Sequence, residues 1–115
     1  MNRRDETILT KMLGYCDETE AAHRYFQEDR ALFLNEREGA IYRNAVAMPI
    51  LQIGELAKNL SETFRSKNKD VPWRDIIRMR DLFAHHYGAV DYEQLWDTSR
   101  EDVAMLREWI AGEKR

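Results

Sequence analysis

The sequence predicts an all-α protein, an up-and-down bundle of four to five helices that forms one domain over residues 1–115. Three observations carry this prediction. Apolar residues recur at the three- and four-residue spacings of a helix. Only 5 glycines and 2 prolines occur in 115 residues, and 43% hydrophobic with 34% charged residues is typical of a folded, helix-rich protein. A chain of this length buries one core without a disulfide or a structural metal.

The first predicted helix covers residues 5–26. Its apolar positions fall on one helical stripe, namely Ile8, Met12, Tyr15, Ala22 and Phe26. Residues 26–38 show a less clear pattern, so we expect a turn in that segment.

A longer helix is predicted over residues 36–65. Its apolar residues repeat every three or four positions: Val46, Ile50, Ile53, Ala57, Leu60 and Phe64. Others widen the stripe: Ile41, Ala45, Met48 and Leu56. A helix that is apolar on more than one side lies in the centre of a bundle or faces a partner. Pro49 predicts a kink because it lacks an N–H and its ring clashes with the preceding turn. Gly54 predicts a close approach of another backbone.

A polar, basic loop over residues 66–71 separates the long helix from a third helix, predicted over residues 73–86. Pro72 suits the start of this helix, because its missing N–H is not needed there. Gly88 is placed to end it.

Asp91 is expected to cap the last helix, with Gln94 three residues later as in a capping box. Thr98 and Glu101 form a second capping box. This second box predicts a break in the last helix near Asp97.

The charge distribution leaves two interpretations open. A net charge of −3 argues against general, non-specific binding of nucleic acid. The segment 65–80 nevertheless holds two acidic residues against six basic ones: Arg65, Lys67, Lys69, Arg74, Arg78 and Arg80. This segment is either a solvated loop and helix start or a local site for phosphate.

Residue usage indicates a cytoplasmic protein without a metal or cofactor. The single cysteine, Cys16, excludes an internal disulfide and a multi-cysteine metal site. Three histidines without dense ligand spacing make a bound metal an unfavoured interpretation, and we interpret the lone His23 as structural. Acidic residues follow the N-terminus at once, so we expect no signal peptide. No apolar run approaches the roughly 18 residues of a membrane span.

The segment 80–91 contains the residues best suited to chemistry. It places Arg80, His85, His86 and Tyr87 close together, including two of the three histidines. RNA is cleaved without metal when a base takes the ribose 2′-OH proton and an acid protonates the leaving 5′-oxygen. Histidine suits both transfers, because its ordinary pKa is about 6.5. The arginine fork stabilises phosphate oxygens as they gain charge.

Helical spacing limits how these side chains meet. At about 100° per residue, Arg80 and Tyr87 share nearly one helix face, whereas His85 lies about 140° from Arg80. The length of Arg80, a loosened helix near His86 or a second copy of the protein would close that gap. The alternative without function is that Arg80 and His85 interact with the helix dipole near its C-terminus.

The string Arg80-x4-His85-x-Tyr87 resembles the Arg-x4-His-x-Tyr signature of HepT-like proteins of the HEPN superfamily. Other landmarks occur in the same order across roughly residues 5–110. They are Gly54-Glu55-Leu56-Ala57 in the long helix, Val71-Pro72-Trp73 before Met79-Arg80, and Val90-Asp91 before Trp96.

This resemblance implies a homodimeric ribonuclease toxin whose Arg-His motifs line a cleft between two protomers. Arg80 would stabilise phosphate and His85 would act as acid and base, with Asp81 in the polar position that follows the arginine. His86 is a supporting candidate rather than a required one. Glu55 on the long helix either lines the cleft or faces solvent.

The resemblance also implies a partner. In HepT-like toxins the motif tyrosine, here Tyr87, is modified with AMP by an MntA-type nucleotidyltransferase antitoxin. The alternative function is a catalytically silent HEPN subunit that binds nucleotide or docks a nucleotidyltransferase. The intact motif favours the RNA-cleaving toxin.

Overall fold

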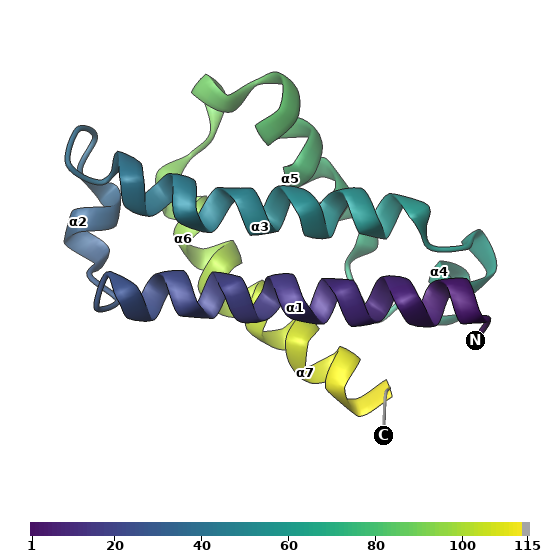
Figure 1. Ribbon diagram of the computed structural model, residues 1–115. Coiled ribbons are helices and arrows are strands. Elements are labelled where there is room, and N and C mark those ends of the chain that lie inside the picture. The colour runs from purple at the N-terminus through teal and green to yellow at the C-terminus, as the bar shows by residue number, and fades with distance from the viewer. Residues whose placement is uncertain (114–115) are drawn as a thin grey trace.

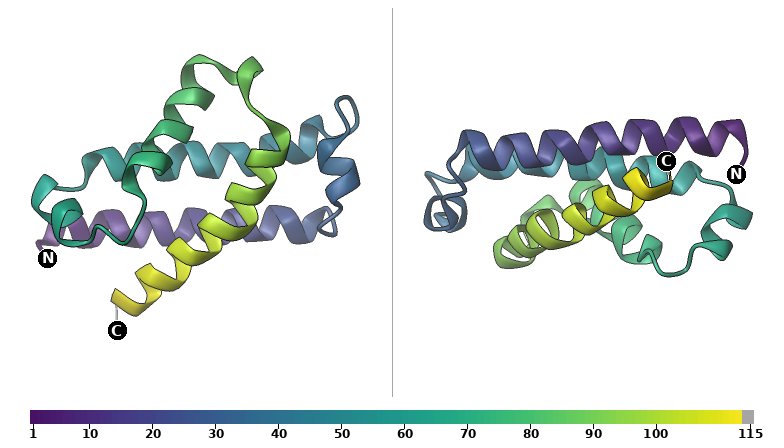
Figure 2. Two further views of the ribbon diagram at one scale, coloured as in Figure 1. Left: turned by 180° about the vertical axis from the view of Figure 1, so that it is seen from behind. Right: turned by 90° about the horizontal axis from the view of Figure 1, so that it is seen from below.

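The computed structural model describes residues 1–113, and every regular element within them is helical (Figure 1). The predicted all-α class is confirmed. Two long antiparallel helices, α1 (Arg3–Tyr25) and α3 (Ala40–Asn59), lie side by side in one layer. On one face of this layer, α5 (Trp73–His85) packs on α3 and α7 (Val103–Glu113) packs on α1 (Figure 2). Both run obliquely to the long helices (Figure 2).

Helix α1 begins and ends close to the predicted positions. The Asn2 side chain accepts a hydrogen bond from the Asp5 backbone N at 2.7 Å, as an N-cap does. The chain then turns at Gln27 and Glu28, whose φ angles are 60° and 53°. A short helix, α2 (Arg30–Leu34), follows where we expected only a turn, and Asp29 caps it.

The predicted helix over residues 36–65 is wrong at both ends, because α3 begins at Ala40 and ends at Asn59. Leu60 is extended, and Ser61 caps a separate short helix, α4 (Glu62–Lys67). The buried Asp5 carboxylate accepts hydrogen bonds from the Ser61 backbone N at 2.9 Å and from its Oγ at 2.8 Å. Those bonds hold Ser61 outside the helix, while Leu60 and Phe64 stay buried as predicted.

The expected kink at Pro49 is also wrong. Helix α3 continues through Pro49, and its ribbon runs nearly straight (Figure 1). Extensive packing of α3 against α1 along its length favours the straight form. The missing N–H of Pro49 therefore removes one hydrogen bond without interrupting the helix.

Helix α5 matches its prediction to within one residue, but its end does not depend on Gly88. No glycine among the described residues has a positive φ. The helix instead ends at His85, where His86 turns to φ −141° and a 3₁₀ turn, η1 (Tyr87–Ala89), follows.

The last helical run starts as predicted, and its first α-helix ends at Asp97, where the break was predicted, although the chain stays helical. The Asp91 side chain accepts hydrogen bonds from the backbone N atoms of Glu93 and Gln94, and so caps α6 (Tyr92–Asp97). A π-helical turn, η2 (Thr98–Asp102), joins α6 directly to α7. The second capping box is therefore not used.

His23 lies in the core, in agreement with its interpretation as structural. Its Nδ1 is 2.5 Å from the Tyr42 hydroxyl and its Nε2 is 2.8 Å from Ser99 Oγ. Ser99 Oγ donates its own hydrogen to the Trp96 carbonyl at 2.9 Å. The imidazole must therefore donate from Nε2, and in its neutral form its Nδ1 accepts from the Tyr42 hydroxyl.

Burial lowers the pKa of His23 to about 4, helped by the nearby Arg100. Because the unfolded state takes up a proton near pH 6.5 and the folded state does not, stability is complete above pH 6.5 and falls as the pH drops toward 4. The loss should reach about 2–3 kcal/mol in urea unfolding. His23→Gln should flatten this pH slope, whereas His86→Gln, at an exposed site, should keep it. An equal slope in both variants would contradict this assignment.

Candidate functional site

The site depends on a close contact between α3 and α5 at Gly54. A Cβ built on Gly54 would lie 2.2 Å from Arg80 Cβ and 3.1 Å from the Ile76 carbonyl oxygen. Only glycine fits there without moving α5, so the predicted close approach is confirmed. The contact places Arg80 directly beside the residue that follows Gly54, which is Glu55.

Two carboxylates hold the Arg80 guanidinium. Its Nε lies 2.9 Å from Glu55 Oε2 as an ion pair without hydrogen-bond geometry, and its Nη1 donates to Asp81 Oδ1 at 3.0 Å. Glu55 thus pairs with Arg80, but its side chain is 45% exposed and it does not line the open depression beside Arg80. Arg80 is 19% exposed, and its Nη2 has no hydrogen-bond partner within residues 1–113. The Nη2 group of Arg80 is therefore available to donate a hydrogen bond to a ligand.

Arg80 and the motif histidines line one open depression of about 500 Å³. Its lining residues are Lys58, Arg78, Arg80, Asp81, Leu82, His85 and His86. Both imidazoles are exposed and lack a hydrogen-bond partner among the described residues. The structure thus brings a partly free guanidinium and two exposed imidazoles to the same surface.

Tyr87 does not line this depression, so its predicted shared face with Arg80 is wrong. The physical reason is that α5 ends at His85, and the helical angles do not extend to η1. The Tyr87 hydroxyl donates to Asn44 Oδ1 on α3, and burial raises its pKa while Arg43 opposes the shift. The tyrosine as a whole is still 46% exposed.

Arg43, the residue before Asn44, is buried and binds the backbone of residues 33–36. Arg43 is 4% exposed and donates to three backbone carbonyls, those of Phe33, Asn35 and Glu36, at 2.5–2.7 Å. Its guanidinium also lies 3.8 Å from the centre of the Tyr92 ring. The sequence pattern did not single out Arg43 or Asn44, because one polar residue beside an apolar stripe carries no distinct signal.

Part of the basic segment 65–80 lies where phosphate could bind, and part is a solvated loop and helix start. Arg78 and Arg80 line the depression, joined by Lys58 from α3, which the sequence analysis missed. Lys67, Lys69 and Arg74 are exposed outside it and fit the solvated interpretation.

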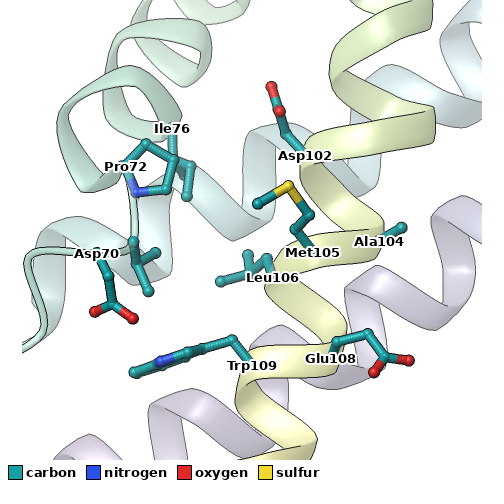
Figure 3. Close-up of a pocket in the computed structure, with 10 residues that line it drawn as sticks. Asp70, Pro72, Ile76, Asp102, Ala104, Met105, Leu106, Glu108 and Trp109 are labelled. Atoms are coloured by element: carbon teal, nitrogen blue, oxygen red, sulfur yellow. The ribbon is translucent and has the colours of Figure 1, made fainter.

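The molecule also has an apolar hollow of about 430 Å³ that none of the predicted site residues lines (Figure 3). Met105, Leu106 and Trp109 of α7 line it opposite Pro72 and Ile76. Its mouth carries the carboxylates of Asp70, Asp102 and Glu108. This lining offers packing surface but no acid–base pair, so we place the candidate site in the depression beside Arg80.

Two further properties concern the described residues. Within residues 1–113, no three His, Cys, Asp or Glu side chains form a group that could hold a metal ion. None of the helices in that range combines the length and apolar character needed to cross a membrane.

A family model described as "Ribonuclease HepT-like" matches residues 15–111. The chain therefore belongs to the HepT-like ribonuclease family, within the HEPN superfamily. This confirms the predicted membership of the HepT-like family.

The relatives carry ribonuclease names. "Probable ribonuclease HepT" of Thermococcus cleftensis is 40% identical over 63 residues, which is 55% of this chain and 57% of that protein. A protein of Caldanaerobacter subterraneus subsp. tengcongensis, provisionally named an RNase, is 35% identical over 68% of this chain and 79% of its own length. Another, of Methanocaldococcus jannaschii, is 26% identical over 93% of this chain and 85% of its own. No solved structure matches the chain.

The Gly54 contact can be tested by adding one methyl group. Gly54→Ala should push α5 away from α3 and lower the free energy of unfolding by about 1–3 kcal/mol. Gly14→Ala is the matched control, because a Cβ there meets nothing within 4 Å. It should raise stability by about 0.5–1 kcal/mol, since alanine favours a helix interior. Urea unfolding of both variants measures this, and a stabilised Gly54→Ala protein would contradict the contact.

Proposed function

We propose that this protein is a metal-independent endoribonuclease, the toxin of a HEPN/MNT toxin–antitoxin pair. One observation carries the proposal: Arg80, with a free guanidinium edge, and His85 line the same open depression. Membership of the HepT-like ribonuclease family and the names of the relatives support it.

In the proposed reaction the ribose 2′-oxygen forms a bond to phosphorus and the 5′-oxygen leaves. A base takes the 2′-OH proton, and an acid gives a proton to the leaving oxygen. His85 serves one of these transfers. Arg80 binds the phosphate oxygens through its free Nη2 edge and stabilises the charge that they gain in the transition state. Glu55 and Asp81 position the guanidinium and do not touch the reacting atoms.

One imidazole cannot deliver a proton and remove another in the same step, so the site needs a second group. His86 of the same depression, or His85 of a second copy, fills this role. We favour the second copy because α3 has an apolar surface beside the site. Ile41 is 74% exposed and Met48 is 59% exposed, and helical spacing puts both on one face with Glu55. Packing two copies along this face would bury these side chains and join the two depressions in one cleft.

Tyr87 is the proposed site of AMP addition by an MntA-type nucleotidyltransferase. The tyrosine is half exposed, which suits a modified residue, and its hydroxyl oxygen is held by Asn44. Asn44 and Glu55 are eleven residues apart on α3, or roughly 16 Å along the helix. Tyr87 directly follows His86, which lines the depression, so an attached AMP would obstruct RNA by bulk and negative charge.

The alternative function is a silent HEPN subunit that binds nucleotide or docks a nucleotidyltransferase. The exposed, unpaired imidazole of His85 favours the active enzyme, because a silent subunit has no need of an accessible acid–base group.

Replacement of the two motif residues tests this function directly. His85→Ala should lower the RNA cleavage rate by about 10²–10⁴-fold while the circular dichroism spectrum stays unchanged. Arg80→Lys should restore little of the loss caused by Arg80→Ala, because lysine lacks the planar fork. Light scattering on the same samples should report a dimer. Cleavage that EDTA abolishes and magnesium restores would refute the metal-free mechanism.

Tyr87→Phe separates modification from catalysis. The variant loses only the hydroxyl and its bond to Asn44, so it should fold, cleave RNA and escape neutralisation by a nucleotidyltransferase supplied with ATP. Mass spectrometry of the wild-type protein with that partner should find AMP on the peptide that contains Tyr87. Tyr92→Phe is the control. The Tyr92 ring packs against the Arg43 guanidinium, and this variant should still be neutralised. A neutralised complex with unmodified Tyr87 would contradict the proposal.

A further inference from the structure

The depression beside Arg80 is locally positive although the chain carries a net charge of −3. Three cationic side chains line it, Lys58, Arg78 and Arg80, against one carboxylate, Asp81. A concave surface of one charge sign attracts ions of the opposite sign, even on a protein whose total charge repels them. The ligand of this depression is therefore an anion.

The three cations are not equally available to that anion. The charge of Arg80 is largely engaged by Glu55 at 2.9 Å and Asp81 at 3.0 Å. Lys58 reaches Asp81 only at 3.9 Å and its side chain is 42% exposed. Arg78 is exposed and has no ion-pair partner within residues 1–113. The exposed side chains of Lys58 and Arg78 therefore remain available to a ligand, in addition to the Nη2 group of Arg80.

These two charges come from different helices that the Gly54 contact holds together. Lys58 lies in the last turn of α3, and Arg78 lies about half a turn before Arg80 on α5. A single phosphate at Arg80 has its own donor in the free Nη2 edge. The additional pair fits a polyanion whose charges repeat along a chain.

We propose that Lys58 and Arg78 form a second phosphate subsite, which binds the RNA backbone phosphate next to the scissile one. The inference rests on the proposed ribonuclease function and extends it to how the substrate strand is held. Neither residue takes part in the proton transfers. Their contribution is to binding, so their loss should raise KM and leave kcat close to the wild-type value.

The test compares three glutamine substitutions that each remove one charge. Lys58→Gln and Arg78→Gln should each raise the KM for a single-stranded RNA about fivefold. Arg74→Gln is the matched control, because Arg74 is exposed on the same helix as Arg78 but does not line the depression. It should leave KM unchanged. Melting temperatures of all three should match the wild type, since neither Lys58 nor Arg78 is buried.

Salt dependence provides a second measurement that a merely structural role would not move. The dissociation constant of a 2′-O-methyl RNA, which cannot be cleaved, is measured by fluorescence anisotropy between low and high salt. Each lost phosphate contact should reduce the slope of log Kd against log salt by about 0.7. Arg78→Lys should restore the slope, because it restores the charge.

The outcomes separate the subsite from the proposed function. Wild-type cleavage with identical KM and salt slope in Arg78→Gln and Arg74→Gln would overturn the subsite and leave the ribonuclease standing. Absent wild-type cleavage would overturn the ribonuclease. Binding of the 2′-O-methyl RNA that still depends on Lys58 and Arg78 would then support the subsite as an anion site alone.

Discussion

The contact of Gly54 with Arg80 is the constraint on which the site depends. Because Gly54 has no side chain, α3 and α5 approach until its Cα lies against the Arg80 side chain. This approach holds the Arg80 guanidinium beside Glu55. The depression is then walled by the last turn of α3 and by α5. The rest of the bundle supports this pair, since α1 packs along α3 and α7 packs on α1.

The electrostatic design of the site is a compromise between order and availability. A free arginine in solution samples many rotamers, and ordering such a side chain costs entropy when a ligand binds. Glu55 and Asp81 order Arg80 beforehand, but they also compensate its charge. The neighbouring cations restore a positive surface without loosening the arginine. Arg80 is thus the residue held in an accurate position, whereas Lys58 and Arg78 need only lie near the bound anion.

The fold was predictable from the sequence because apolar periodicity reports burial directly. What failed depended on contacts between distant segments. The long helix ends at Asn59 because Asp5, 56 residues before Ser61, binds the backbone there. The last helix changes to a π-helical turn after Asp97 and not to a break with a new side-chain cap. For the site, Arg80 and His85 line one depression although their spacing puts them about 140° apart on a helix. Tyr87 does not follow the helical spacing, because α5 ends at His85. Lys58 and Asn44 come from another helix, and no local pattern marks them.

The π-helical turn determines which side of the last helix faces the core. Leu95 and Val103 are both buried, yet they are eight residues apart, which on an unbroken α-helix separates them by about 80°. A π-turn takes up one extra residue, and this brings the two side chains to within roughly 20° of each other. The π-helical turn thus accommodates one residue more than an α-helical turn would, and the chain stays helical.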